Sequence, residues 1–274
     1  MHRLVAFLVG VVAGAFITWQ VVNRLSMFPQ GSSATGWIIL RESQRIPKTI
    51  HFVYGLWDDF DKMPPTFQET IDAWGRVGFK PKLWNRDMCE ALLTSRPEYG
   101  KYIAMYRKFP RNVQRADFIR YLIVYDQGGF YMDLDAKPGH VSLYDHGALI
   151  SKKAVFFVEV VVDEEHSIRQ AEVHPIREGV PEAHERIANY AFGSTANHVA
   201  LKLILGEVER RWLKFQAVAG DPDYYVLFTT GPSAMTRALQ LVRMHKSLHV
   251  FDMEAAHSLV NHTGAGTWRS AKDV

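Results

Sequence analysis

The sequence predicts an α/β domain with a largely parallel sheet. Two observations support this prediction. From residue 46 onward, β-branched and aromatic runs alternate with segments of helical spacing, which is the pattern of βαβ units. A short apolar run at 130–134 follows two glycines and has the composition of a fully buried strand. The 274 residues are 47% hydrophobic, enough for one large domain with appendages.

The first half of the domain supplies the alternation. Its strands are β-branched or aromatic runs, and its helices begin at Pro or Asp and end near Gly or Ser. In order, we expect a strand at 49–54, a helix from Pro65 to Gly75, a strand at 79–84, a helix at 87–95 with Asp87 near its N-cap, and a helical stretch at 97–108.

The helix expected at 112–127 is the most informative. Its apolar side chains form one stripe, and Asp117 and Arg120 share another face. One interpretation is a surface ion pair worth about 0.2–0.5 kcal/mol. The other is that the Gly128-Gly129 turn leads this helix directly into the strand at 130–134, which would put the pair beside the acids that end that strand. Spacing alone does not choose between them.

The second half continues with shorter elements. We expect strands at 154–160, 187–192, 224–228 and 248–251, and helices at 197–215 and 232–245. Polar stretches at 163–186 and 216–223 are expected to form loops, and such loops commonly carry binding specificity. The Gly-rich tail at 261–268 contains His262 and Trp268, so either a disordered end or an ordered segment is compatible with it.

Asp133 and Asp135 end the buried strand. Side chains two residues apart on an extended chain point to the same side, so both carboxylates can face one cation. Two other Asp-x-Asp matches, at 59–61 and 221–223, lie among Pro, Gly and polar residues and are typical of turns. Carboxylates at the end of a hidden strand are costly unless a metal or a basic side chain compensates them. A metal site is therefore favoured over a capped loop.

Composition excludes some functions. A formal net charge of +3, with no stripe of Lys and Arg interleaved with aromatic residues, gives no support for nucleic-acid binding. The single cysteine, Cys89, excludes an internal disulfide framework.

The N-terminus contains an uncharged apolar run at 4–22, which is long enough to span a bilayer as a helix. Trp19 suits the interface, and Arg3 and Arg24 flank the run. We expect a retained transmembrane anchor at 1–25, a stem at 26–45 and the globular domain at 46–274. A cleaved signal peptide is the alternative.

Several stretches together resemble the DXD-containing glycosyltransferases of the GT-A (Rossmann-like) type. The similarity is to the family of the fungal initiating α-1,6-mannosyltransferase and the inositol-phosphoceramide mannosyltransferases, and more distantly to the glucosylating domain of large clostridial toxins. The stretches are Ile46–His51, Arg115–Tyr121, Gly128–Asp135, Thr230–Pro232, and His262 with Trp268. The resemblance covers about residues 46–268 and implies a nucleotide-diphospho-sugar transferase domain with a mixed, mostly parallel sheet.

The resemblance also implies roles for individual residues. Asp133 and Asp135 would hold a divalent cation, Mn²⁺ or Mg²⁺, on the diphosphate of the donor, and His262 would close over the metal or the diphosphate. The donor-binding residues would be Tyr54 on the base, Asp117 and Arg120 on the sugar hydroxyls, Tyr131, and Trp268 packing beside His262. Glu159 is a candidate contact for the acceptor.

The implied activity is metal-dependent, retaining transfer of a hexose, mannose or galactose, from GDP-mannose or a UDP-hexose to a glycan or glycolipid. A bound divalent cation neutralises the charge that develops on the departing nucleoside diphosphate. Such a cation prefers hard oxygen ligands, and the carboxylates of Asp133 and Asp135 are ligands of this kind. We find no nucleophile and expect front-face displacement. In a eukaryote, the run at 4–22 would make this a single-pass, type II membrane protein of the Golgi.

Two other classes are considered. A haloacid-dehalogenase-like phosphohydrolase also ends a buried strand with Asp-x-Asp and would use Asp133 as its nucleophile. Thr229 or Thr230 could serve as its downstream hydroxyl, but the sequence offers no convincing acidic pair at a later strand end. A non-catalytic, membrane-tethered sugar-binding protein would leave Asp133 and Asp135 as surface acids.

Overall fold

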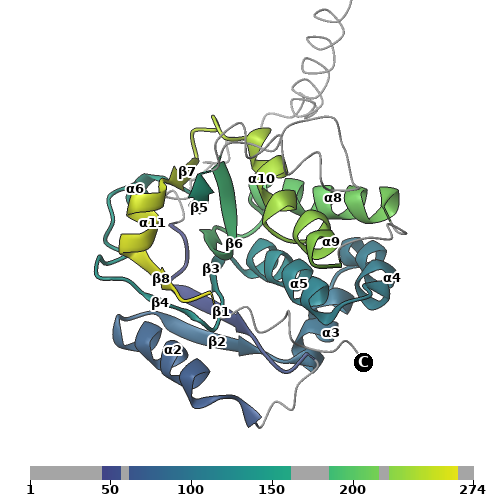
Figure 1. Ribbon diagram of the computed structural model, residues 1–274, viewed down its shortest axis with the longest axis horizontal. Helices are drawn as coiled ribbons and strands as arrows, with labels where there is room; N and C mark the ends of the chain where they lie inside the picture. Colours follow the sequence, from purple (N-terminus) through teal and green to yellow (C-terminus); the bar gives the residue numbers. More distant parts are fainter. Residues whose placement is uncertain (1–44, 57–61, 162–184, 216–221, 265–274) are drawn as a thin grey trace, which may run out of the picture. The chain divides into compact units, whose positions relative to one another are not determined.

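A six-stranded sheet forms the centre of the Glu42–Val274 unit (Figure 1). The computed structural model describes residues 45–56, 62–161, 185–215 and 222–264. The strands are β1 (Thr49–Val53), β2 (Lys80–Trp84), β3 (Gly129–Met132), β5 (Ala154–Val161), β6 (Glu185–Ser194) and β7 (Leu248–Phe251), in the order β2-β1-β3-β6-β5-β7. In this sheet β6 runs against the other strands. The predicted α/β class with a mixed, mostly parallel sheet is confirmed.

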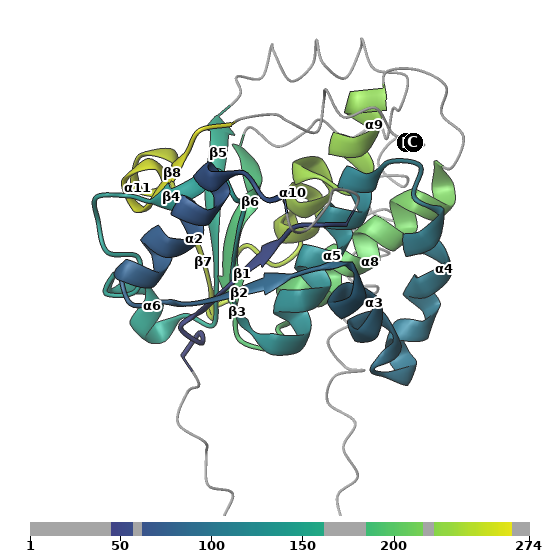
Figure 2. The same ribbon diagram turned by 90° about the horizontal axis from the view of Figure 1, so that it is seen from below.

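Helices cover both faces of the sheet (Figure 2). One face carries α2 (Pro65–Arg76), α6 (Ala148–Ser151) and α11 (Met253–Leu259), together with a small sheet of β4 (Ala136–Pro138) and β8 (Val260–His262). The other face carries α3 (Arg86–Thr94), the 3₁₀ turn η2 (Pro97–Tyr99), α4 (Gly100–Lys108), α5 (Asn112–Gln127), α8 (Val199–Lys214), α9 (Pro222–Thr229) and α10 (Pro232–Gln240). Each layer has its own apolar core.

Helix α5 has the predicted bounds but not the predicted exposure. Every residue from Ala116 to Val124 is buried, because the helix lies between the sheet and α8. The prediction of a surface helix with one apolar stripe is therefore wrong for this stretch, which is buried on its polar face as well. As a consequence Asp117 and Arg120 are interior side chains, and a surface ion pair is excluded.

The turn between α5 and β3 requires its two glycines. Gly128 and Gly129 have φ angles of 67° and 100°, which L side chains rarely adopt. A Cβ at Gly128 would lie 2.8 Å from the backbone nitrogen of Ala196, and one at Gly129 would lie 2.7 Å from the carbonyl oxygen of Thr49. The glycines thus connect the buried helix directly to the buried strand.

His51 stabilises this turn as a neutral side chain. Its Nδ1 accepts a hydrogen bond from Nε1 of Trp84 at 3.0 Å, so its Nε2 carries the proton that it donates to the carbonyl oxygen of Gly128 at 2.9 Å. Burial lowers the pKa of His51 to about 4.

Several expected elements are corrected. The run at 224–228 is not a strand but part of α9, since a short buried apolar run has no period that separates strand from helix. Asp223 accordingly lies in the first turn of this helix rather than in a turn. The helix expected at 232–245 ends at Gln240 and turns follow. Asp87 lies near the N-cap of α3 as expected, in its first turn, and the cap itself is Asn85, whose side chain accepts from the backbone amide of Met88.

Some predictions lie outside the described residues. These are the anchor at 1–25, nearly all of the stem at 26–45, the Asp-x-Asp at 59–61, most of the loop at 163–186, and Trp268. Within the part of the chain that is described, each helix is too short or too polar to cross a bilayer.

Candidate active site

The two acids lie in a turn, not on an extended strand. β3 ends at Met132, and the amide of Ala136 donates to the carbonyl oxygen of Asp133 at 2.9 Å, which closes the turn. The amide of Asp133 donates to the carbonyl oxygen of Tyr190 on β6 at 2.8 Å. The expectation that strand alternation aligns the carboxylates is therefore wrong, and the turn brings them together instead.

His262 reaches the turn through the small sheet. Ala136 of β4 pairs with His262 of β8, and the amide of Thr263 donates to the carbonyl oxygen of Asp135 at 3.1 Å. Nε2 of His262 consequently lies 3.3 Å from Oδ1 of Asp135. The chain is thus ordered through this part of the tail, and of the two alternatives for 261–268 the ordered one holds for residues 261–264.

Tyr190 supports the imidazole of His262. The two rings are stacked, with centroids 3.7 Å apart and planes 19° apart. Burial lowers the pKa of His262, but its hydrogen bond to Asp135 and the nearby carboxylates outweigh burial and raise the pKa overall. The sequence interpretation missed Tyr190, because an aromatic residue in a buried strand gives no signal that distinguishes it from core.

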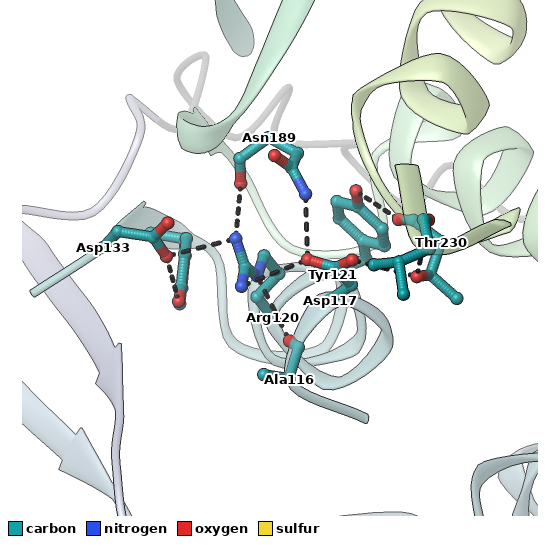
Figure 3. Close-up of polar contacts among 9 residues, drawn as sticks. Ala116, Asp117, Arg120, Tyr121, Asp133, Asn189 and Thr230 are labelled. Atoms are coloured by element: carbon teal, nitrogen blue, oxygen red, sulfur yellow. Dashed lines mark hydrogen bonds and ion pairs between the residues drawn. The ribbon is translucent and has the colours of Figure 1, made fainter. Parts of the chain in front are cut away.

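Arg120 lies between two acids (Figure 3). One terminal guanidinium nitrogen is 3.2 Å from Oδ1 of Asp117, and the other is 3.1 Å from Oδ1 of Asp133. Its Nε donates to the carbonyl oxygen of Ala116 at 3.2 Å, and its guanidinium lies 4.7 Å from the ring centre of Tyr131. The second interpretation of the Asp117–Arg120 pair, beside the acids that follow β3, is confirmed in its geometry.

Asp117 is fixed by two neutral donors as well as by Arg120. Asn189 donates from its side-chain amide to Oδ1 at 2.9 Å, and the Thr230 hydroxyl donates to Oδ2 at 2.9 Å. Burial raises the pKa of Asp117 to about 6, although Arg120 and the hydrogen bonds act in the opposite direction. Asn189 was also missed, and its signal is a polar amide inside the mostly apolar run at 187–192.

Asp133 has a similar environment. The hydroxyl of Tyr131 donates to its Oδ1 at 2.7 Å, the same oxygen that faces Arg120. Burial raises the pKa of Asp133, and the charge of Arg120 opposes this rise. The side chains of Asp133 and Asp135 are only 29% and 17% exposed, so they are not the surface acids that a non-catalytic scaffold would have.

The residues present fit a divalent cation. Asp133, Asp135 and His262 each offer one ligand atom, and these atoms lie within 4.8 Å of one another. The carboxylates of Asp117 and Asp133 share the guanidinium of Arg120, and that of Asp135 faces the imidazole of His262, so acidic groups gather in a half-buried place. Two carboxylate oxygens suit Mn²⁺ or Mg²⁺, whereas an imidazole nitrogen is a ligand typical of transition metals.

Other predicted site residues lie nearby or remain untested. Tyr54 follows β1 at the edge where Asp133 follows β3, and its ring meets Phe67 edge-on, with centroids 6.0 Å apart. Glu159 on β5 accepts from Nε of Arg186 at 3.0 Å, and its charge helps to raise the pKa of His262. The roles of Tyr54, Glu159 and Trp268 stay predictions.

Comparison with known families defines the class of this region. Residues 58–142 match the family model described as "Glycosyltransferase sugar-binding region containing DXD motif". This stretch includes Asp117, Arg120, Asp133 and Asp135. The resemblance to DXD glycosyltransferases is confirmed for it.

Named relatives point in the same direction. The chain is 30% identical over 99 residues to "Inositol phosphoceramide mannosyltransferase 1" of Schizosaccharomyces pombe, which is 34% of this chain and 29% of that protein. It is 33% identical over 92 residues to "Mannosyl phosphorylinositol ceramide synthase CSH1" of Saccharomyces cerevisiae, 34% of this chain and 23% of that protein. The matches thus span less than a third of the length of these relatives.

Solved structures show weaker likeness. The "PaToxG Glycosyltransferase" structure aligns with 72% of this chain and 70% of its own, at 14% identity and a TM-score of 0.41. The ligand-free glycosyltransferase domain of the YGT toxin aligns with 68% of this chain and 56% of its own, at 12% identity and a TM-score of 0.37.

Proposed function

We propose that this chain is a metal-dependent, retaining glycosyltransferase that moves a hexose from a nucleotide-diphosphate sugar to a glycan or glycolipid. One observation carries the proposal: Arg120 connects the Asp133–Asp135–His262 cluster to the fixed carboxylate of Asp117. A cation site for the diphosphate therefore lies next to a carboxylate that can accept hydrogen bonds from sugar hydroxyls. Both lie largely within the region that matches the sugar-binding family model.

Asp133, Asp135 and His262 would hold Mn²⁺ or Mg²⁺. When bound, such a cation supplies charge neutralisation for the departing diphosphate. Oδ1 of Asp133 is taken by Tyr131 and Arg120, so Oδ2 would be the atom directed at the cation. Tyr190 stacks on the ring of His262 and would thereby hold the imidazole in its orientation toward the cation.

Asp117 and Arg120 would position the donor sugar. The carboxylate of Asp117 has three donors around it, so its orientation is set before a ligand arrives. A pre-oriented acceptor for hydroxyl groups lowers the entropy cost of reaching the reactive geometry. Tyr54 would stack on the base of the nucleotide, and Tyr131 and Trp268 would complete the donor site.

Mannose is the favoured sugar because the fungal relatives are named mannosyltransferases, so GDP-mannose is the first donor to test and UDP-hexoses are the second. With no nucleophile assigned among the site residues, front-face displacement with retention is the expected course. The run at 4–22 supports a single-pass membrane protein, of the Golgi in a eukaryote.

The test is donor hydrolysis by the full chain in detergent, with Mn²⁺ and a panel of GDP- and UDP-sugars. We expect release of one nucleotide, which a chelator abolishes and Asp135→Ala removes. Asp145→Ala is the matched control, since Asp145 is an exposed acid that accepts from Ser142. Absence of both metal binding and turnover would favour the non-catalytic alternative. Phosphatase activity without a sugar donor, lost in Asp133→Asn, would favour the hydrolase.

A further inference from the structure

The edge of the central sheet opposite the candidate site is basic. Because β1, β2, β3, β5 and β7 run in the same direction, their N-terminal ends share one edge. The partly or fully exposed side chains there include those of Arg45, Lys48, Arg76, Lys80, Lys153 and Lys246, which we call the basic edge.

Contacts divide the basic edge into two groups, one at each end of the strand order. The amide of Lys80 donates to the carbonyl oxygen of Lys48 at 2.9 Å, and Arg45 and Lys48 both lie over the ring of Tyr144, at 4.8 and 4.6 Å. At the other end of the sheet, the amide of Lys153 donates to the carbonyl oxygen of Ser247 at 2.8 Å, next to Lys246. The positive charges therefore form two groups at the N-terminal ends of the parallel strands, one at β1 and β2 and one at β5 and β7.

Acidic side chains are scarce along this surface. In the described stretches that flank it, the acids include Asp126, Asp145 and the exposed Glu98, whose charge acts on Arg96. Asp126 is buried and paired with Arg96 at 2.6 Å, so it contributes little negative charge outside. The site edge has the opposite character, since Asp133, Asp135, Glu159, Glu185 and Asp252 lie at strand ends there.

Large apolar side chains project from the same surface. Val77 precedes β2 and is 51% exposed, Ile150 precedes β5 and is 63% exposed, and Met244 precedes β7 and is 96% exposed. Lysine and arginine interleaved with exposed apolar side chains complement a surface with anionic headgroups above an acyl layer. A soluble polyanion would be complemented by the charges alone.

We propose that the basic edge docks on the anionic headgroups of a bilayer. The described residues begin at Arg45, which is itself part of the basic edge. In this pose the acidic site edge points away from the bilayer, which favours an acceptor glycan that extends from the membrane. The proposal does not depend on the sugar or on the activity.

The test is lysine footprinting of the full chain in nanodiscs, with an amine-acylating reagent and mass spectrometry. Discs of phosphatidylcholine alone are compared with discs that contain about 30% phosphatidylserine. We expect acylation of Lys80, Lys153 and Lys246 to slow at least about threefold in the anionic discs, and salt at about 0.5 M to reverse this by screening. Lys108 and Lys214, exposed at the C-terminal ends of α4 and α8, serve as internal controls and should not change.

Matched variants sharpen the result. Lys80→Glu with Lys246→Glu should remove the protection of Lys153, whereas Lys108→Glu with Lys214→Glu, an equal change in net charge, should retain it. Equal labelling in both kinds of disc would overturn the proposal, and so would protection of Lys108 and Lys214. Protection by soluble heparin equal to that by anionic discs would also overturn it, because it would assign the edge to polyanions in general. The wild-type footprint decides even if a variant fails to fold.

Discussion

Two histidines near opposite ends of β3 are used in opposite ways. His51 reaches the turn before the strand, where it lies between the indole of Trp84 and the carbonyl of Gly128, both neutral. His262 reaches the turn after the strand, where it faces Asp135. Burial lowers the pKa of His51 to about 4, whereas carboxylates overcome burial and raise the pKa of His262.

The difference shows how one strand serves two purposes. At the Gly128 end the partners of His51 are neutral, and the buried Asp126 nearby is paired with Arg96, which stabilises the fold without unbalanced charge. At the Asp133 end carboxylates outnumber the guanidinium of Arg120, an arrangement that costs stability unless a cation joins it. Changes at the first end should therefore affect unfolding, and changes at the second should affect ligands and activity. Arg120 is the exception, because it holds the charged end together.

Arg120→Met should have the largest effect. It leaves the buried Asp117 and the half-buried Asp133 without their cation, which we expect to lower the free energy of unfolding by about 3–5 kcal/mol, mostly through Asp117. Denaturant titration measures the loss. Adding Asp117→Asn should restore part of it by removing one of the stranded charges. A single variant as stable as the wild type would contradict the role given to Arg120.

Asp135→Asn should affect activity and not folding. Losing one anionic ligand is expected to slow sugar transfer by about 10²–10³-fold, while the midpoint of unfolding without metal stays the same or rises, since one of several crowded carboxylates is neutralised. Steady-state rates and thermal unfolding of the same preparation check both parts. A large fall in stability with an unchanged rate would show that Asp135 serves the fold rather than the activity.

Acid should weaken the other end. The unfolded chain protonates His51 below its ordinary pKa near 6.5, but the folded chain does so only near 4. The free energy of unfolding should therefore fall by up to about 1.4 kcal/mol per pH unit between these values, about 3 kcal/mol in total. The comparison is with His51→Gln, which keeps a donor for Gly128 but does not titrate. The difference between the two pH profiles isolates His51, and parallel profiles would refute its contribution.

Gly128→Ala should have the smallest of these effects, about 2 kcal/mol of lost stability. The φ angle of 67° is unfavourable for alanine, and its Cβ would lie 2.8 Å from the backbone of Ala196. Gly206→Ala in α8 is the control, because a Cβ there has no neighbour within 4 Å and alanine favours the helix. We expect the control to gain about 0.5–1 kcal/mol by the same denaturant assay. Equal effects of the two substitutions would contradict the proposed strain.

Local pattern predicted much of the fold. β1, β2, β5, β7 and α5 begin and end within one or two residues of their expected bounds, because their composition and flanking Gly or Pro act over short range. The strand predicted at 224–228 was wrong, because a few consecutive apolar residues suit a buried helix equally well. The fully buried environment of α5 was also not visible in its spacing.

The sequence by itself determined the α/β class, the acids that follow β3, and the residues Asp117 and Arg120 one helix earlier, because each depends on spacing within a few turns or strands. Only the tertiary structure decided that Asn189 and Thr230 hold Asp117, and that β8 pairs with β4 and so places His262 at Asp135. These partners are distant in sequence and are selected by packing between layers, which no local period records. The local sequence thus determines which charged residues the site contains, and the tertiary fold determines how they are arranged.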